Sequence, residues 1–209
     1  MIVVDYIPSL LLFILFCLSH SLFASVKIKA RIFDRFPSFK PFYRLIYNIS
    51  SLILLALFAY TLPPDNVLYS ASGLLFVLLI TIQVISALSA LFTLRGHGSE
   101  FLGFRQIKEF LRSGRMPAYL DEPEKGELIR KGFYRYIRHP LYTFSMILLL
   151  AMPVMTLNLV FIITLTGIYF YTGTFFEERK LIKRFGNSYR QYREEVPRFL
   201  PRVSAIINI

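Results

Sequence analysis

Long stretches without charged side chains alternate with shorter basic stretches along this chain. Four stretches contain no Asp, Glu, Lys or Arg: residues 6–26, 45–64, 66–94 and 140–176. A bilayer core of about 30 Å is crossed by about 20 helical residues. The first three stretches therefore each predict one transmembrane helix, the third of them tilted or extended into the interface. The fourth predicts two helices of about 18 residues, joined by a turn in AMPVMTLN (151–158), where Pro153 and Asn158 interrupt the apolar pattern.

This pattern predicts an all-α integral membrane protein with five transmembrane helices, the last two forming a helical hairpin. All 24 Lys and Arg residues fall into three segments: residues 27–44, 95–139 and 177–209. Five spans put these segments on one side of the membrane, which the positive-inside rule makes cytoplasmic. We therefore expect the N-terminus outside and the C-terminus in the cytoplasm. The predicted regions are a three-span part (1–94), a cytoplasmic loop (95–139) and the hairpin with a covering C-terminal helix (140–209).

Composition supports a membrane protein. The chain is 55% hydrophobic yet carries a formal charge of +11, a combination that a soluble domain avoids and that lipid-embedded spans with flanking cations explain. The cations suit a lipid bilayer with anionic head groups, whereas their mixing with acids, as in DEPEKGE (121–127), argues against nucleic acid. Cys17 is the only cysteine, so no internal disulfide can form. We expect no metal and no obligate protein partner.

The segment GFYRYIRHPLYTF (132–144) places Arg138 and His139 directly before the fourth uncharged stretch. Proline is favoured in the first turn of a helix, so Pro140 predicts that the fourth helix begins there. Unpaired backbone N–H groups and the positive end of the helix dipole would then make this corner a site for a carboxylate or a phosphate. The alternative is that these cations contact lipid phosphates.

The predicted hairpin returns the chain to the same corner. Glu177 and Glu178 are the first acids after the fourth uncharged stretch, and they would arrive beside the start of the fourth helix. Carboxylates next to anion-binding donors would suit a zwitterionic amino-acid group. The alternative is a structural salt bridge that closes the hairpin. Three tyrosines add aromatic faces for a cation or a flat ring: Tyr134, Tyr136 and Tyr142.

Apolar residues recur at helical spacing after the two glutamates, with Lys and Arg between them: Leu181, Ile182, Phe185, Tyr189 and Tyr192. This pattern predicts an interfacial amphipathic helix that ends at Pro197. Its apolar stripe favours anchoring over catalysis. We expect the helix to lie over the corner and to exclude water from it.

Two segments together are specific enough to suggest a family: GFYRYIRHPLY (132–142) and FFEERKLIKRFGNSYRQYREEVPRFLPR (175–202). They resemble the C-terminal half of the isoprenylcysteine carboxyl methyltransferase and phospholipid N-methyltransferase superfamily, through G-x-Y-R-x-x-R-H-P-x-Y, a glutamate pair, F-G-x-x-Y-x-x-Y and V-P-R-x-x-P-R. HSLFAS (20–25), FYRLIYNISSL (42–52) and FLGFRQI (101–107) are similar to its methanethiol S-methyltransferase and NnrU-type branch.

The resemblance implies a membrane methyltransferase that uses S-adenosylmethionine to methylate a small thiol such as methanethiol. It implies these cofactor contacts: Arg138, His139, Pro140 and Tyr142 at the methionine moiety, Glu177 and Glu178 at the ammonium or ribose, and Tyr134 and Tyr136 at the adenine. Because the thiolate is the nucleophile, a nearby cation would assist by lowering the pKa of the thiol. Candidates are Arg105, Arg138 and His139, with Arg105 and Gln106 as acceptor-side residues after the third span.

Other functions stay open beside this one. The acceptor could instead be a prenylcysteine carboxylate or a phospholipid amine, and a non-catalytic membrane accessory protein of the NnrU type is a different class. Sterol reductases share a related RH-x-x-Y and V-P-x-x-x-P pattern, but their longer chain and second set of spans are missing. A transporter is disfavoured because spans two and three contain no Asp, Glu, Lys or Arg for an ion path.

Overall fold

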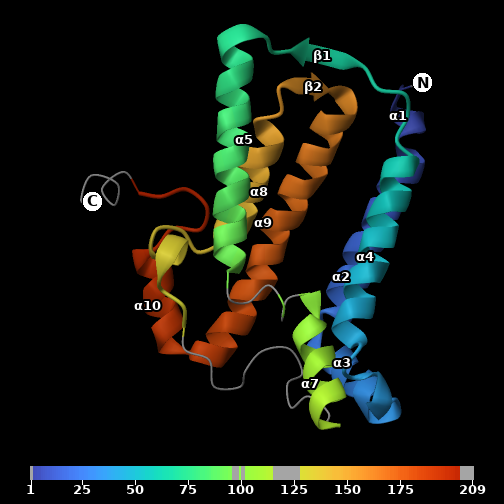
Figure 1. Ribbon diagram of the computed structural model, residues 1–209, viewed down its shortest axis with the longest axis vertical. Helices are drawn as coiled ribbons and strands as arrows, with labels where there is room; N and C mark the ends of the chain where they lie inside the picture. Colours follow the sequence, from blue (N-terminus) through green and yellow to red (C-terminus); the bar gives the residue numbers. More distant parts are fainter. Residues whose placement is uncertain (1, 96–98, 100–101, 115–127, 203–209) are drawn as a thin grey trace. The chain divides into compact units, whose positions relative to one another are not determined.

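The computed structural model describes residues 2–95, 99, 102–114 and 128–202. These residues are mostly helical and belong to two compact units (Figure 1). Unit 1 comprises the described parts of Met1–Pro64 and Gly96–Gly126, and unit 2 those of Asp65–Arg95 and Glu127–Ile209.

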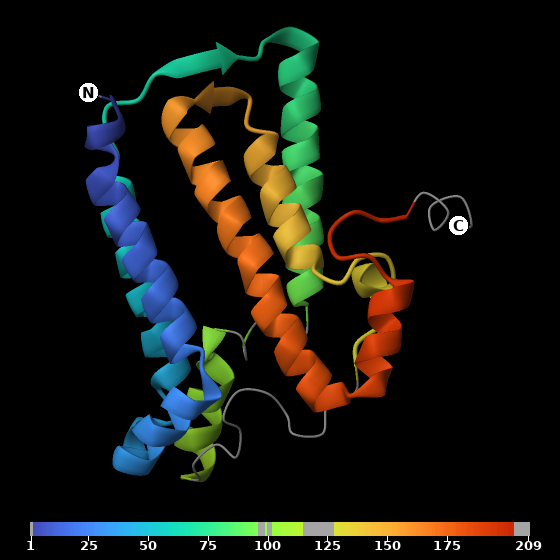
Figure 2. The same ribbon diagram turned by 180° about the vertical axis from the view of Figure 1, so that it is seen from behind.

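Unit 1 is built on two antiparallel helices. Its elements are α1 (Ile2–Asp5), α2 (Ile7–Phe23), α3 (Val26–Arg35), the 3₁₀ turn η1 (Pro37–Phe39), α4 (Tyr43–Tyr60) and α7 (Phe104–Ser113). α2 and α4 pack side by side, and α3 bends away from α2 by 69° (Figures 1 and 2). Ser9 on α2 donates to the carbonyl of Thr61 at 2.7 Å, and His20 Nδ1 lies 3.1 Å from Ser51 Oγ on α4. Polar contacts thus join the two apolar helices near both ends.

Unit 2 contains the remaining elements. They are β1 (Val67–Ser70), α5 (Gly73–Leu94), the 3₁₀ turn η2 (Gly132–Arg135), α8 (Pro140–Leu150), β2 (Val154–Thr156), α9 (Leu157–Phe185) and α10 (Asn187–Glu195). α8 lies along both α5 and α9, and Gln83 on α5 donates to the carbonyl of Leu148 on α8 at 3.1 Å. Figure 2 shows α5, α8 and α9 side by side, with β1 and β2 paired at one end.

The short antiparallel pair corrects the prediction of an all-α fold. β1 and β2 pair with Tyr69 opposite Met155, and Asp65 Oδ1 accepts from the backbone N–H of Asn158 at 3.0 Å. The side chain of Thr156 caps α9 by accepting from the N–H of Leu159 at 3.1 Å. The sequence analysis predicted only a turn in 151–158 and no strand, because strands this short carry almost no alternation of apolar and polar residues.

The predicted hairpin exists, but its two helices are unequal. α8 has 11 residues and α9 has 29, which correspond to lengths of about 16 Å and about 43 Å. The prediction of two helices of about 18 residues is therefore wrong. α9 continues past the glutamate pair because Glu, Arg and Lys are good helix formers, so the onset of charge does not end a helix.

The predicted C-terminal amphipathic helix is also corrected. α9 ends at Phe185 and is capped by Gly186, whose φ of +59° and ψ of −128° L-residues rarely adopt, and α10 begins at Asn187. The apolar stripe packs inside unit 2. Tyr189, Tyr192 and Val196 form a buried cluster, against which pack Leu128, Leu181, Ile182 and Phe185.

Helices long and apolar enough to cross a membrane are present in the described part of the chain. They are α4, α5 and α9, and the bent pair α2–α3 raises the number to four if it counts as one span. The shorter α8 is apolar as well. Most large apolar residues of α5 are exposed, as expected for a helix that faces lipid.

Candidate active site

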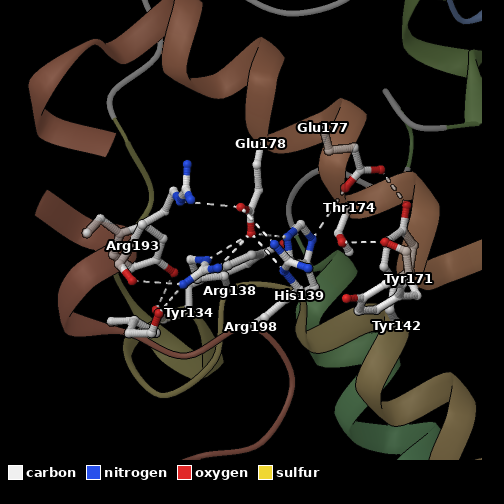
Figure 3. Close-up of polar contacts among 12 residues, drawn as sticks. Tyr134, Arg138, His139, Tyr142, Tyr171, Thr174, Glu177, Glu178, Arg193 and Arg198 are labelled. Carbon is white, nitrogen blue, oxygen red and sulfur yellow. Dashed lines mark hydrogen bonds and ion pairs between the residues drawn. The ribbon is translucent and has the colours of Figure 1, made fainter. Parts of the chain in front are cut away.

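The start of α8 and the last turns of α9 meet in unit 2 (Figure 3). His139, the residue before α8, has its Nδ1 atom 3.4 Å from Glu177 Oε2 and its Nε2 atom 3.3 Å from Glu178 Oε1. The predicted meeting of the Arg–His–Pro element with the glutamate pair is thereby confirmed. It follows from the hairpin, since α9 carries the chain back along α8.

Glu178 is at the centre of this cluster and only 3% exposed. Arg138 donates to its Oε1 atom through Nη2 at 2.8 Å and through Nε at 3.0 Å. Arg198 Nε lies 3.3 Å from the same oxygen, and Arg193 Nε lies 3.4 Å from Oε2. Several guanidinium groups around one buried carboxylate favour its ionised form and leave the cluster with an excess of positive charge.

Arg138 also ties the cluster to the end of α10. Its Nη1 atom donates to the carbonyls of Arg193, at 2.9 Å, and of Val196. A guanidinium presents its donors in a fixed planar fork, so one side chain can satisfy a carboxylate and two carbonyls at once. Arg138 therefore connects three parts of unit 2 that are distant in sequence.

The chain after α10 lies alongside the start of α8. Three hydrogen bonds join the two segments: Arg138 N–H to Pro197 O at 2.9 Å, His139 N–H to Arg198 O at 3.1 Å, and Thr143 Oγ1 to Phe199 O at 3.1 Å. The sequence predicted an anion site with unpaired N–H groups here. This part of the prediction is wrong for the N–H groups of Arg138 and His139, because carbonyls of the chain itself accept from both.

The His139 imidazole is buried and has a carboxylate at each ring nitrogen. Burial alone would lower the pKa of His139, but the hydrogen bonds and charges of Glu177 and Glu178 raise that pKa above its usual value. When both ring nitrogens donate, the ring is an imidazolium without a free lone pair. The surroundings of His139 therefore favour its cationic form, in which both ring nitrogens donate and the ring orients Glu177.

Glu177 is the more accessible of the two acids, with its side chain 45% exposed. The hydroxyl of Tyr142 donates to its Oε1 atom, and the Tyr142 ring stacks on Phe170 at 4.4 Å. Burial, together with the charge of Glu177, raises the pKa of Tyr134. A half-exposed carboxylate thus lies among aromatic rings, beside the cations that surround the buried Glu178, an arrangement suited to a small cationic group.

Comparison with known proteins identifies the family. A family model described as "Protein of unknown function (DUF1295)" matches residues 39–196, which is most of the chain. The chain belongs to this family. No solved structure matches the chain.

Several named relatives resemble this DUF1295 protein over most of its length. Methanethiol S-methyltransferases 1 and 2 of Bradyrhizobium diazoefficiens are 31% identical over 202 residues and 32% identical over 206 residues. The matches cover 93% and 94% of this chain, and 66% and 73% of the relatives. The Protein-S-isoprenylcysteine O-methyltransferase of Schizosaccharomyces pombe is 29% identical over 114 residues, and the match covers 49% of this chain and 48% of that relative. The resemblance noted from the sequence is confirmed.

Most of the predicted site residues of this DUF1295 protein lie in unit 2. Pro140 is fully buried at the start of α8, Tyr136 is half-buried after η2, and the carbonyl of Tyr134 accepts from Tyr192 at 2.6 Å. Arg105 and Gln106 lie on α7 of unit 1, where Arg105 pairs with Glu109 at 2.9 Å. Their acceptor-side role stays a prediction.

The sequence reasoning missed Arg193 and Arg198. Both reach Glu178, and the guanidinium of Arg198 also lies 4.4 Å over the ring of Phe175. Arg198 was visible in the V-P-R-x-x-P-R element, but nothing in the sequence indicated that the element folds back onto Arg138. Arg193 looked like one of several solvent-exposed charges of a helix.

Proposed function

We propose that this DUF1295 protein is an integral-membrane, S-adenosylmethionine-dependent methyltransferase that methylates a small thiol such as methanethiol. The observation that carries the proposal is the half-exposed carboxylate of Glu177, held by Tyr142 and His139 beside the arginines that surround the buried Glu178. The relatives that match over most of the chain, and that are named methanethiol S-methyltransferases, support the choice of reaction and acceptor.

The residues present fit the polar groups of this cofactor. Glu177 offers an accessible carboxylate for the ammonium of the methionine moiety, and the excess positive charge around Glu178 favours the carboxylate of the same moiety. Tyr134 and Tyr136, both half-buried, would hold the adenine by stacking. S-adenosylmethionine, when bound, supplies a methyl group activated by a sulfonium leaving group.

The contribution of the chain is positioning and electrostatics. Tyr142 and His139 fix the Glu177 carboxylate, so little side-chain motion remains to be frozen on binding, and orientation accounts for a large part of the acceleration of methyl transfer. The positive cluster favours a thiolate over a thiol in its neighbourhood. In its cationic form, with each ring nitrogen donating to a carboxylate, His139 has no lone pair with which to accept the thiol proton.

The topology that we propose keeps five crossings, with α2, α4, α5, α8 and α9 as the spans and the C-terminus in the cytoplasm. α8 is shorter than a bilayer requires, but it packs along α5 and is continued by β2 and its turn. The distribution of Lys and Arg supports this orientation through the positive-inside rule.

Methyl transfer by the purified protein tests the proposal. The full chain in detergent or nanodiscs is incubated with methyl-labelled S-adenosylmethionine and, separately, methanethiol, a prenylcysteine or phosphatidylethanolamine, and products are identified by mass. We expect dimethyl sulfide from methanethiol, and a loss of about tenfold in cofactor affinity in Glu177→Gln, the size of one lost charge-assisted contact. Absence of a methylated product from all three acceptors would refute the proposal and favour a non-catalytic accessory protein.

Carboxyl methylation of a prenylcysteine is a second candidate. It is favoured by the match to the relative named Protein-S-isoprenylcysteine O-methyltransferase, which covers about half of this chain. The same acceptor series separates the two reactions, because a methyl ester of the prenylcysteine, formed without dimethyl sulfide, would replace the thiol assignment.

A further inference from the structure

The two adjacent glutamates have different surroundings. Glu177 is half-exposed. It contacts His139, which directly precedes α8, and Tyr142, which lies in the first turn of α8. Glu178 is buried, and its contacts include arginines from three places in the chain: Arg138, Arg193 and Arg198. A carboxylate enclosed in this way has little surface left for a ligand, so the two acids are not equivalent parts of one binding site.

The partners of Glu178 indicate what it holds. Arg198 belongs to the segment 196–199, which follows α10 and pairs with the backbone of Arg138 and His139. We call residues 196–199 the C-terminal strap. The Arg198 guanidinium reaches Glu178 through Nε at 3.3 Å and Nη2 at 3.4 Å while its face covers Phe175. Glu178 is thus the anionic centre on which the strap, the end of α10 and the start of α8 converge.

From this geometry we propose, building on the proposed function, that Glu178 is a positioning residue and not a cofactor ligand. It fastens the C-terminal strap across the start of α8 through Arg138, Arg193 and Arg198. In doing so it fixes the His139 ring, which in turn holds Glu177 in place. The two glutamates therefore have different roles: Glu177 faces the cofactor, and Glu178 holds the C-terminal strap against the start of α8.

The attachment of the C-terminal strap by Glu178 has a direct physical basis. Charge-assisted hydrogen bonds are about twice as strong as neutral ones, and removing one partner of a buried ion pair leaves the other charges uncompensated. Without the Glu178 charge, the three arginines would repel one another. The strap would then detach more often, and it would expose the backbone N–H groups of Arg138 and His139 to water.

Hydrogen exchange measures this detachment without requiring activity. Amide exchange of the full chain is followed by mass spectrometry in peptides that cover residues 138–143, without cofactor, for wild type, Glu178→Gln and Glu177→Gln. The two variants are matched, because each makes the same isosteric change one residue apart on α9. We expect exchange at residues 138 and 139 to accelerate about tenfold or more in Glu178→Gln and to stay within about twofold of wild type in Glu177→Gln.

Titration with S-adenosylmethionine gives the complementary readout. We expect Glu177→Gln to weaken binding at every pH. In Glu178→Gln the midpoint of the pH dependence of binding should move to lower pH, because His139 loses one of its two carboxylate neighbours and keeps only Glu177. A purely structural role of Glu178 would lower the amount of folded protein without shifting this midpoint.

Two results would overturn the proposal. One is unchanged exchange in Glu178→Gln together with weakened binding, which would make Glu178 a ligand. The other is equal acceleration in both variants. If wild type bound no S-adenosylmethionine, the proposed function would fail, and the exchange data would still decide whether Glu178 holds the strap.

Arg198→Met keeps the proposal testable if Glu178→Gln does not fold. Arg198 is 20% exposed, so its replacement leaves a smaller buried defect. The variant should accelerate exchange at residues 138 and 139 as Glu178→Gln does, and the two changes combined should add little, since they break the same contact. If amide exchange at residues 138 and 139 in Arg198→Met is as slow as in wild type, the claim that Glu178 holds the C-terminal strap through Arg198 is refuted.

Discussion

Arg138→Lys tests whether the planar guanidinium, and not merely a positive charge, holds the corner together. Arg138 donates two hydrogen bonds to Glu178 and one each to the carbonyls of Arg193 and Val196. An ammonium on a flexible stem can satisfy the carboxylate or the carbonyls, but not both groups at once. About two of the four bonds are lost. With buried acceptors left unpaired, we expect a destabilisation of about 2–4 kcal/mol.

Thermal unfolding in detergent measures this loss. The transition is followed by circular dichroism, because the chain has no Trp to report it by fluorescence. For a chain of 209 residues the expected cost corresponds to a fall in Tm of roughly 4–16 °C. Arg135→Lys is the matched control, since Arg135 belongs to the same motif but is exposed, and a change of under about 0.5 kcal/mol is expected there. Equal and small effects of both variants would show that the fork of Arg138 is not needed.

Three further outcomes are expected. Tyr192→Phe removes the buried hydrogen bond from the Tyr192 hydroxyl to the Tyr134 carbonyl and should cost about 1 kcal/mol of unfolding free energy in the same melting experiment. Gly186→Ala places a side chain at φ +59° between α9 and α10 and should cost about 1–2 kcal/mol, although a Cβ there would have open space. The pKa of His139 is raised in the folded protein, so its stabilising effect is complete below about pH 6.5 and is lost as pH rises through the folded-state pKa. Melting of wild type across this range should therefore show a decline that Glu177→Gln reduces.

Each of these outcomes has a result that would contradict it. A neutral Tyr192→Phe would mean that water replaces the lost donor at the Tyr134 carbonyl. A stable Gly186→Ala would mean that the α9–α10 junction can adopt another conformation, whereas Gly167→Ala, in the interior of α9 with its nearest neighbour at 3.7 Å, should be tolerated. Equal pH slopes of Tm in wild type and Glu177→Gln would show that His139 does not gain its charge from that carboxylate.

The sequence by itself determined the membrane character, the hairpin and the residues that meet in it. Uninterrupted apolar runs are long enough for spans, and a hairpin must return its end to the level of its start, so Glu177 and Glu178 had to arrive near Arg138 and His139. Pro140 located the start of α8, because the missing N–H of proline costs nothing in a first helical turn. The length of an apolar run and the preference for proline in a first helical turn depend only on local sequence, so they can be applied before the tertiary structure is known.

Only the tertiary structure decided which glutamate is buried and what covers the start of α8. Adjacent residues on a helix differ in direction by about 100°, so Glu178 faces the arginines while Glu177 faces outward, and no sequence pattern states which direction is inward. Pairing of the C-terminal strap with Arg138 and His139 depends on a turn at Gly186 and on contacts some 60 residues apart. Such long-range contacts are selected by the packing of the whole unit, and not by the local preferences of either segment.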